Sequence, residues 1–271
     1  NMKSVKLGFI GCGNMATAII KGLIAQSVIP RDDIRVFDID PKKTKKIAEY
    51  GVTISGDLFK LLDDTNIIML CVKSNSCEEV LNGIKDYMDE NKVLVSIVAG
   101  ISIEYLASFF KGNVKIVRTM PNTPALIGCG MTGVSFNEHV SDEEKKTVKQ
   151  IFSSIGRVEV IDEELMDVVT AVSGSSPAYT YMYIEALADG AVLGGMPRDK
   201  AYIFAAQAVI GAAKMVLELK EHPGKLKDMV CSPAGTTIEA VKTLEEGGFR
   251  STIINAVKNC YEKSKRMGEP R

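Results

Sequence analysis

Short apolar runs alternate with longer amphipathic stretches over the first 160 residues of the chain. The short runs are rich in Val, Ile and Leu, as buried strands are, and the stretches between them repeat apolar residues at helical spacing. The expected strands are residues 5–10, 34–37, 67–72, 93–98, 114–119, 131–136 and 157–161. A capping box, Ser141 with Glu144, opens the helix between the last two strands. This alternation predicts βαβ units, and therefore an α/β domain with a parallel sheet.

The pattern changes after about residue 162, where strand-like runs stop. The expected helices beyond this point are residues 163–172, 177–194, 198–219, 223–230, 236–247 and 249–267, with Gly and Pro between them. A chain of 271 residues is also longer than a single core of about 100 to 150 residues. We therefore expect an α/β domain over residues 1–162 and an all-helical domain over residues 163–271.

Two of the predicted helices carry apolar residues around most of their circumference. Residues 186–195 and 203–216 are rich in Ala and Gly, a composition typical of helices that are buried on several sides. The helical domain is too small to bury both surfaces by itself. The sequence therefore predicts a homodimer formed through this domain, and it leaves the number of subunits beyond two open.

Charge and hydropathy narrow the choice of partner. With 33 basic and 34 acidic residues the net charge is -1, which gives no overall attraction to nucleic acid or to an anionic membrane. Uninterrupted apolar runs such as residues 67–72 are too short to span a bilayer, and the first residues lack a secretory signal pattern. We expect a cytoplasmic protein with a small-molecule partner.

The six cysteines are widely scattered and form no Cys-x-x-Cys pair, and the chain has only two histidines. Such spacing predicts neither a metal site nor a disulfide framework. The cysteines are interpreted as small hydrophobic residues in a reducing compartment, because no histidine is placed to activate a thiol.

A glycine-rich turn follows the first predicted strand and opens the first predicted helix. Its sequence is Gly11-Cys12-Gly13-Asn14-Met15-Ala16, which fits the Gly-x-Gly-x-x-Ala pattern of dinucleotide-binding domains of the Rossmann type. The first glycine permits a tight turn, the second lets backbone N–H groups approach a pyrophosphate, and the small Ala16 lets helix and strand pack closely. The turn therefore predicts a nicotinamide dinucleotide as cofactor.

Asp38 ends the second predicted strand, where an acidic side chain can bind the adenosine ribose hydroxyl of NADH and repel the 2'-phosphate of NADPH. This position favours NADH over NADPH. Lysines follow at once, at positions 42, 43, 45 and 46, and either reach a phosphate or form an ordinary solvated helix face.

Further segments carry a resemblance to a known family, and with the glycine-rich turn they follow one another along nearly the whole chain. They are residues 71–73 (CVK), 96–101 (SIVAGI), 118–124 (RTMPNTP), 167–179 (DVVTAVSGSSPAY), 185–190 (EALADG) and 232–238 (SPAGTTI). In these segments the chain resembles the pyrroline-5-carboxylate reductases. The resemblance implies NAD(P)H-dependent reduction of L-1-pyrroline-5-carboxylate to L-proline, the last step of proline biosynthesis.

The resemblance also implies site residues. Cofactor contacts are expected at the ends of strands, from Cys71, Val72, Lys73, Ala99, Gly100, Pro121 and Asn122. Three positions depart from the family pattern: Ser74 replaces a Pro, Ser176 replaces a Gly, and Ala234 replaces the first Gly of Ser-Pro-Gly-Gly-Thr-Thr. The departures are small, but they affect loops that the family keeps tight.

The segment around Ser232 is a loop entering a helix, so its hydroxyl and N–H groups suit a carboxylate. We assign carboxylate binding to Ser232, Gly235 and Thr236, and we expect Thr237 to hydrogen-bond the ring nitrogen of the imine. Taken alone, the same pattern fits an ordinary Ser/Thr helix cap. Glu163 matches a ligand-lining position that favours a positive iminium, and it fits equally well as an acid at a helix N-terminus.

Two other functions use the same fold. A hydroxyacid dehydrogenase needs a helix lysine as general base, for which the helical part offers Lys200 and Lys214, but the chain lacks the glycine-rich substrate loop expected with it. A redox-sensing regulator needs a DNA-binding module, and no helix-turn-helix or basic stripe is visible. Imine reduction is the function that the sequence favours.

Overall fold

The computed structural model describes residues 5–268 of the chain. Backbone contacts divide the chain into two compact units: Asn1–Ser175 together with Cys260–Arg271, and Ser176–Asn259. The last strand ends at Val160, close to the change of pattern at residue 162. The first unit nevertheless continues through Ser175 and includes the end of the last helix, so the helical unit is inserted within it along the chain.

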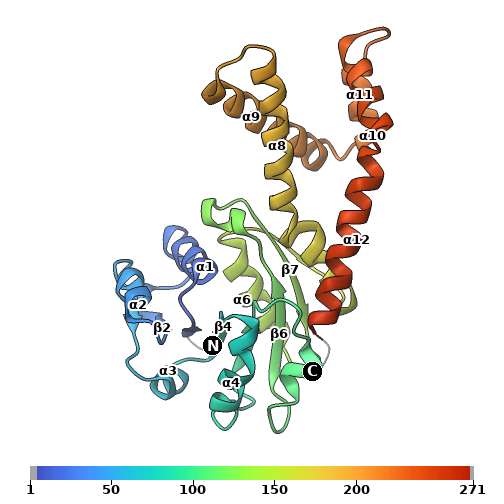
Figure 1. Ribbon diagram of the computed structural model, residues 1–271. Helices are drawn as coiled ribbons and strands as arrows, with labels where there is room; N and C mark the ends of the chain where they lie inside the picture. The colour runs from blue at the N-terminus through green and yellow to red at the C-terminus, as the bar shows by residue number, and fades with distance from the viewer. Residues whose placement is uncertain (1–4, 269–271) are drawn as a thin grey trace. The chain divides into compact units, whose positions relative to one another are not determined.

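The first unit is built on an eight-stranded sheet with the order β3-β2-β1-β4-β5-β6-β7-β8 (Figure 1). Its strands are β1 (Leu7–Ile10), β2 (Ile34–Phe37), β3 (Thr53–Ile54), β4 (Ile67–Leu70), β5 (Val93–Ser96), β6 (Lys115–Met120), β7 (Gly130–Phe136) and β8 (Gly156–Val160). Strands β1 to β6 pair in parallel, and β7 runs antiparallel to β6. The expectation of a parallel sheet is therefore corrected at β7.

The reversal at β7 follows from the length of the connection before it. Only a short 3₁₀ turn, η2 (Thr123–Ile127), joins β6 to β7. A parallel strand requires a crossover of a dozen or more residues, so a connection this short returns the chain in the opposite direction. The two-residue strand β3 was not expected, because a strand this short has no readable alternation of apolar and polar residues.

Helices cover both faces of the sheet and bury two apolar clusters. They are α1 (Asn14–Ala25), η1 (Arg31–Asp33), α2 (Pro41–Ala48), α3 (Leu58–Asp64), α4 (Ser74–Ile84), α5 (Ile103–Ala107) and α6 (Asp142–Ser153). One cluster lies under α1 and α6, and the other lies under α3, α4 and α5. Neighbouring residues of β4 alternate between the clusters, Met69 in the first and Leu70 in the second, because successive side chains of a strand point to opposite faces.

The segment after β8 differs from the single helix that the pattern predicts over residues 163–172. It forms a 3₁₀ turn η3 (Glu163–Leu165), a short helix α7 (Met166–Val169) and a π-helical turn η4 (Thr170–Gly174). The wide turn is closed by the Ser175 N–H, which donates to the Thr170 carbonyl at 2.7 Å. π-Turns are rare and often occur at functional sites.

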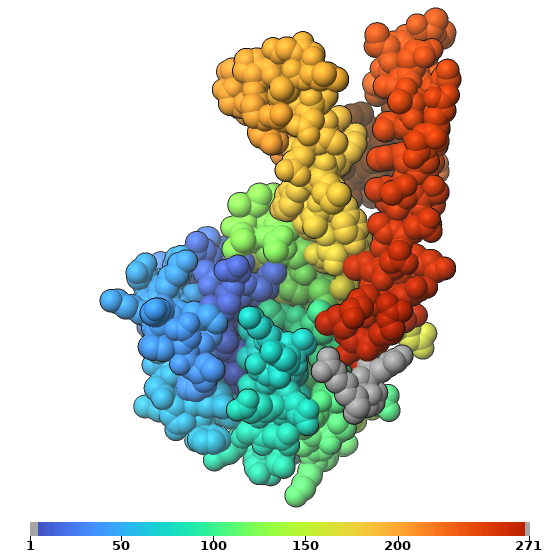
Figure 2. Space-filling model, in the orientation of Figure 1, coloured from blue at the N-terminus to red at the C-terminus, as the bar shows by residue number. Residues whose placement is uncertain are grey.

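The second unit consists of helices alone. They are α8 (Ser176–Leu193), α9 (Arg198–Leu219), α10 (Pro223–Val230), α11 (Thr236–Glu246) and the first part of α12 (Phe249–Met267). Figure 2 shows α8 in yellow and α11 with α12 in red as narrow columns. Many large apolar side chains of the helices in this unit are exposed in the single chain. Exposed apolar surface on this scale marks a place for another protein surface.

Helix α9 corrects one expectation. Among the described residues, α9 is the one helix that is both long enough and apolar enough to cross a membrane, judged by length and composition alone. Its most apolar window has a mean hydropathy of 1.5. Uninterrupted runs such as residues 67–72 did not reveal it, because isolated polar residues break up the apolar stretch of α9. Core helices of soluble proteins pass the same test.

The predicted capping box of α6 is confirmed, and it has a measurable pH dependence. Ser141 and Glu144 hydrogen-bond each other's backbone, and the Lys115 ammonium lies 2.8 Å from the Glu144 carboxylate. Burial by itself raises the pKa of Glu144, but hydrogen bonds from Lys115 and Ser141 outweigh burial and lower that pKa below its ordinary value. The stabilisation is therefore full above the ordinary pKa and is lost as the pH falls through the lower folded value.

We predict that Glu144→Gln lowers the free energy of unfolding by about 1 kcal/mol at neutral pH, because Gln keeps the cap but loses the charge. The difference from the parent protein should be smaller near pH 3, because the carboxylate takes up a proton as the pH falls through its lowered folded pKa. Urea unfolding at the two pH values measures it. Asp142→Asn is the control, because the Asp142 side chain is fully exposed. An equal difference at both pH values would contradict the assignment.

Candidate active site

The glycine-rich turn has the geometry of a phosphate-binding loop. Gly11 adopts φ +99°, and a side chain there would collide with the Cys71 carbonyl of the neighbouring strand end. Gly13 is the N-cap of α1, has no side-chain cap, and faces open space within 4 Å of its missing Cβ. The N–H groups at the start of α1 therefore have room for a pyrophosphate beside them, and the residues present fit a dinucleotide.

The Asp38 carboxylate supports this turn. One of its oxygens accepts the Cys12 N–H at 2.7 Å and the other accepts the Asp40 N–H at 2.8 Å. The side chain is only 8% exposed, and the Lys43 ammonium lies 3.8 Å away. Asp38 thus holds the end of β2 to the glycine-rich turn, a role that its motif position alone did not reveal. Its expected contact with a ribose stays a prediction.

The loops expected to bind the cofactor gather at one edge of the sheet (Figure 1). The turn at Gly11 follows β1, Asp38 follows β2, residues 71–73 follow β4, residues 99–100 follow β5, and residues 121–122 follow β6. These five strands are parallel, so their carboxyl ends lie side by side. The chain also reverses its direction of travel across the sheet at β1, between β2 and β4, and ligands of open α/β sheets lie at such a switch point.

The two thiols at this edge, those of Cys12 and Cys71, are unreactive as nucleophiles. Burial and the neighbouring Asp38 carboxylate raise the pKa of Cys12 to about 12. Burial also raises the pKa of Cys71. Both thiols are therefore protonated at neutral pH, and neither supplies a nucleophile.

Asn122 joins the loop after β6 to the π-turn. Its side-chain NH₂ donates to the Ser173 carbonyl at 3.0 Å, and its side-chain oxygen accepts the Met131 N–H at 2.8 Å. In an α-helix the Ser173 carbonyl would accept the N–H of residue 177, and Pro177 has none. Asn122 satisfies that carbonyl instead, so the Asn122 side chain shapes the loop.

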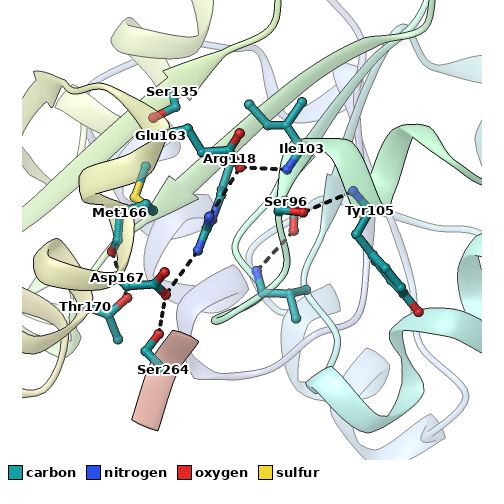
Figure 3. Close-up of polar contacts among 12 residues, drawn as sticks. Ser96, Ile103, Tyr105, Arg118, Ser135, Glu163, Met166, Asp167, Thr170 and Ser264 are labelled. Carbon is teal, nitrogen blue, oxygen red and sulfur yellow. Dashed lines mark hydrogen bonds and ion pairs between the residues drawn. The ribbon is translucent and has the colours of Figure 1, made fainter. Parts of the chain in front are cut away.

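Glu163 lies in an ion pair. Its carboxylate accepts the Ile103 N–H at 2.7 Å and lies 3.2 Å from the Arg118 guanidinium, as Figure 3 shows. The interpretation as an acid that only stabilises a helix end is incomplete, because the segment begins with a 3₁₀ turn and the carboxylate has a specific partner. The expected position of Glu163 beside an iminium stays a prediction.

In the helical unit, the loop before α11 is not an ordinary Ser/Thr cap. Gly235 is the N-cap and no side chain caps the helix, so the first-turn N–H groups of Thr236 and Thr237 lack a side-chain acceptor. Gly235 donates its own N–H to the Ser232 carbonyl at 3.0 Å, and its missing side chain leaves room for the Ser232 hydroxyl. This arrangement suits an external carboxylate.

Several residues around the site were not singled out by the sequence. They are Ser173, Arg118, Asp167 and Ser264, which bond to expected site residues or to one another. Arg118 and Asp167 lie inside the segments that carry the family resemblance, so membership of these segments could have identified them. Ser264 lies in an unremarkable amphipathic helix, and nothing in its local pattern distinguishes it.

A glycine-rich phosphate loop at the switch point of a mostly parallel sheet, with an inserted helical unit, defines a nicotinamide-dinucleotide-dependent oxidoreductase. Comparisons with known proteins make the class specific. Residues 163–267 match the family model for pyrroline-5-carboxylate reductase dimerisation, and residues 6–100 match the model for coenzyme F420-dependent NADP oxidoreductases.

Full-length relatives agree with these matches. The chain is 48% identical to the pyrroline-5-carboxylate reductase of Escherichia coli over 97% of this chain and 98% of that protein. It is 39% identical to the pyrroline-5-carboxylate reductase of Methanosarcina acetivorans over 99% of this chain and 100% of that protein. The structure of the Plasmodium falciparum pyrroline carboxylate reductase with NADP bound superposes with a TM-score of 0.90 at 35% identity, covering 99% of this chain and 100% of that one. The chain belongs to the pyrroline-5-carboxylate reductase family.

The departure at Ala234 has a structural consequence. Ala234 adopts φ +56°, in the left-handed region that disfavours residues with a Cβ. The glycine of the family pattern would take this conformation without strain.

We predict that Ala234→Gly raises the free energy of unfolding by about 1 kcal/mol. Ala240→Gly is the matched control, because Ala240 lies inside α11 and the same change there should lower stability by about 1 kcal/mol. Thermal and urea unfolding of both variants test the pair. A destabilised Ala234→Gly protein would show that the loop does not store this strain.

Proposed function

We propose that this chain reduces L-1-pyrroline-5-carboxylate to L-proline with a nicotinamide dinucleotide, the last step of proline biosynthesis. The observation that carries the proposal is the 48% identity to a pyrroline-5-carboxylate reductase along the whole chain, through both units. The phosphate-binding turn and the uncapped start of α11 support it independently, since the reaction needs a dinucleotide and a site for a carboxylate.

The chemistry asks for position and a proton partner. When bound, the reduced nicotinamide supplies a hydride to the imine carbon, which accepts it once the ring nitrogen is protonated. The turn from Gly11 to Ala16 holds the pyrophosphate, and the strand-end loops at residues 71–73, 99–100 and 121–122 position the rest of the dinucleotide. Buried, protonated Cys12 and Cys71 add no competing nucleophile.

The start of α11 binds the substrate carboxylate. The Ser232 hydroxyl and the N–H groups of Gly235 and Thr236 are its assigned donors, and the positive end of the helix adds to the attraction. The Gly235 N–H already donates within the loop, so we expect Thr236 to provide the stronger backbone contact.

The Thr237 hydroxyl hydrogen-bonds the ring nitrogen. Thr237 is half-buried in the first turn of α11. A threonine hydroxyl is a poor acid at neutral pH, so its role is to orient the iminium or to relay a proton. Glu163 is assigned the second role near the reaction, favouring positive charge on the imine, through a carboxylate that also pairs with Arg118.

We predict that Thr237→Ala lowers kcat/KM for the imine by about a hundredfold. Thr243→Ala is the matched control, because Thr243 lies on the same helix and its hydroxyl only donates to the Glu239 carbonyl at 3.1 Å. Loss of NADH or NADPH absorbance on adding pyrroline-5-carboxylate measures both variants. Wild-type kcat and KM in Thr237→Ala would remove Thr237 from the site.

The proposed cofactor preference is for NADH. The Asp38 carboxylate at the end of β2 repels a 2'-phosphate, and this supports NADH. Two observations favour NADPH instead: the Lys43 ammonium lies 3.8 Å from Asp38, and the P. falciparum relative was solved with NADP bound. Lys43 is half-exposed, so solvent screens its charge, and we weigh the carboxylate more heavily.

We predict that the parent protein has an about tenfold higher kcat/KM with NADH than with NADPH. Asp38→Asn keeps an oxygen that accepts one backbone N–H. This variant should lower the ratio of kcat/KM with NADH to kcat/KM with NADPH. Asp40→Asn is the control, because Asn caps α2 as well as Asp does. The Asp38 assignment is wrong if the parent protein prefers NADPH tenfold.

The helical unit is proposed to form a homodimer in the cytoplasm. A surface hollow on α9 is lined by Ile203, Phe204, Gln207 and Ala208, and the matched dimerisation region contains this helix. A partner subunit would cover these apolar residues, which also accounts for the membrane-like composition of α9 without a membrane.

A further inference from the structure

The end of α12 lies against the loop that follows β5. Gly100 adopts φ +75° in this loop, and a Cβ at that position would lie 3.3 Å from the Met267 Cβ and 3.4 Å from the Ser264 carbonyl oxygen. A Cβ at Gly268 would in turn collide with the Gly100 carbonyl oxygen. The last turn of α12, which belongs to the first unit, therefore packs closely on the expected cofactor loop.

An ionic cluster around the buried Arg118 side chain holds this helix end in place. We call it the Arg118 cluster, and it consists of Arg118, Glu163, Asp167 and Ser264. The Arg118 guanidinium pairs with Glu163 at 3.2 Å and with Asp167 at 3.5 Å, and the Ser264 hydroxyl donates to Asp167 at 2.6 Å. Figure 3 shows Arg118 between the two carboxylates, with Ser264 reaching Asp167 from α12.

The cluster connects five elements of the first unit. Arg118 lies on β6, the two carboxylates lie on η3 and α7, Ser264 lies on α12, and the Ile103 N–H that Glu163 accepts begins α5, directly after the Gly100 loop. The Gly100 loop is thus held from both sides: Glu163 binds its far end at Ile103, and α12 packs on Gly100 itself.

The burial of Arg118 makes the geometry of the Arg118 cluster rigid. The Arg118 side chain is 5% exposed, and its Nε has no hydrogen-bond partner among the described residues. A buried guanidinium depends on its carboxylates, and removing one of them leaves an uncompensated charge that the surroundings must rearrange to solvate. The positions of Glu163, Asp167 and Ser264 are therefore strongly coupled.

We propose that the Arg118 cluster positions the Ala99–Gly100 turn for the dinucleotide, with Asp167 and Ser264 as positioning residues. The inference rests on the proposed function insofar as this turn contacts the cofactor. Because the turn contacts the dinucleotide alike before and during hydride transfer, loosening it weakens cofactor binding and leaves kcat and the KM for the imine unchanged.

The test uses the full-length protein and two variants that remove single groups. Asp167→Asn removes a charge, and Ser264→Ala removes one hydroxyl while the ion pairs stay. We expect each variant to raise the Kd for NADH and for NADPH by about fivefold, measured by nicotinamide fluorescence. Ser264→Ala leaves the Arg118–Glu163 pair intact, so this variant should keep kcat and imine KM within about twofold of the parent. Ser264→Thr keeps a hydroxyl and should retain the parent Kd.

Ser108→Ala is the matched control, because the Ser108 hydroxyl also donates to a carbonyl of the same unit, that of Tyr105 at 2.7 Å, but lies outside the cluster. A parent-like Kd in Ser264→Ala, with only a lower melting temperature, would overturn the proposal even if Asp167→Asn does not fold. The Kd measurement needs no imine. A parent protein that binds NADH without oxidising it on pyrroline-5-carboxylate therefore counts against the proposed function and not against this positioning role.

Discussion

Parallel pairing of β1 between β2 and β4 is the constraint on which the rest of the structure depends. Parallel strands end at the same edge, so a turn that follows β1 must lie beside the ends of its neighbours. Gly11 shows how close that approach is, since its Cα faces the Cys71 carbonyl with no room for a side chain. The phosphate-binding turn, the Asp38 brace and the loops after β4, β5 and β6 all take their places from this register.

Two polar side chains at this edge act mainly on the protein itself. Each carboxylate oxygen of Asp38 accepts a backbone N–H. The Asn122 amide accepts the Met131 N–H and donates to the Ser173 carbonyl. Motif position suggests that such residues touch a ligand, whereas their bonds here set the shape of the loops that would touch it. Preorganised loops of this kind reduce the entropy that is lost when a dinucleotide binds.

Much of the fold could be predicted from periodicity. The limits of β2, α9, α10 and α12 agree with the pattern to the residue, since each is a sharply bounded apolar or amphipathic segment. The direction of β7 could have been predicted, because the connection before it is too short for a parallel crossover. The division of the segment after residue 162 into η3, α7 and η4 could not be predicted, because apolar spacing does not distinguish these turn types. The loops of the site were located by their motifs. The Arg118 cluster was not, because Ser264 lies about 100 residues beyond its partner and only tertiary packing brings the two together.

The return of α12 to the first unit affects the order in which the protein can be completed during synthesis. The sheet and its covering helices leave the ribosome early, but the segment that packs on Gly100 and bonds Asp167 follows only after the whole helical unit, residues 176–259. Until then Asp167, which pairs with the buried Arg118, lacks its hydrogen bond from Ser264, and the Gly100 loop lacks the helix end that packs on it. The nascent chain must therefore hold an unfinished α/β unit while its helices emerge, although such a unit near the N-terminus would ordinarily fold first.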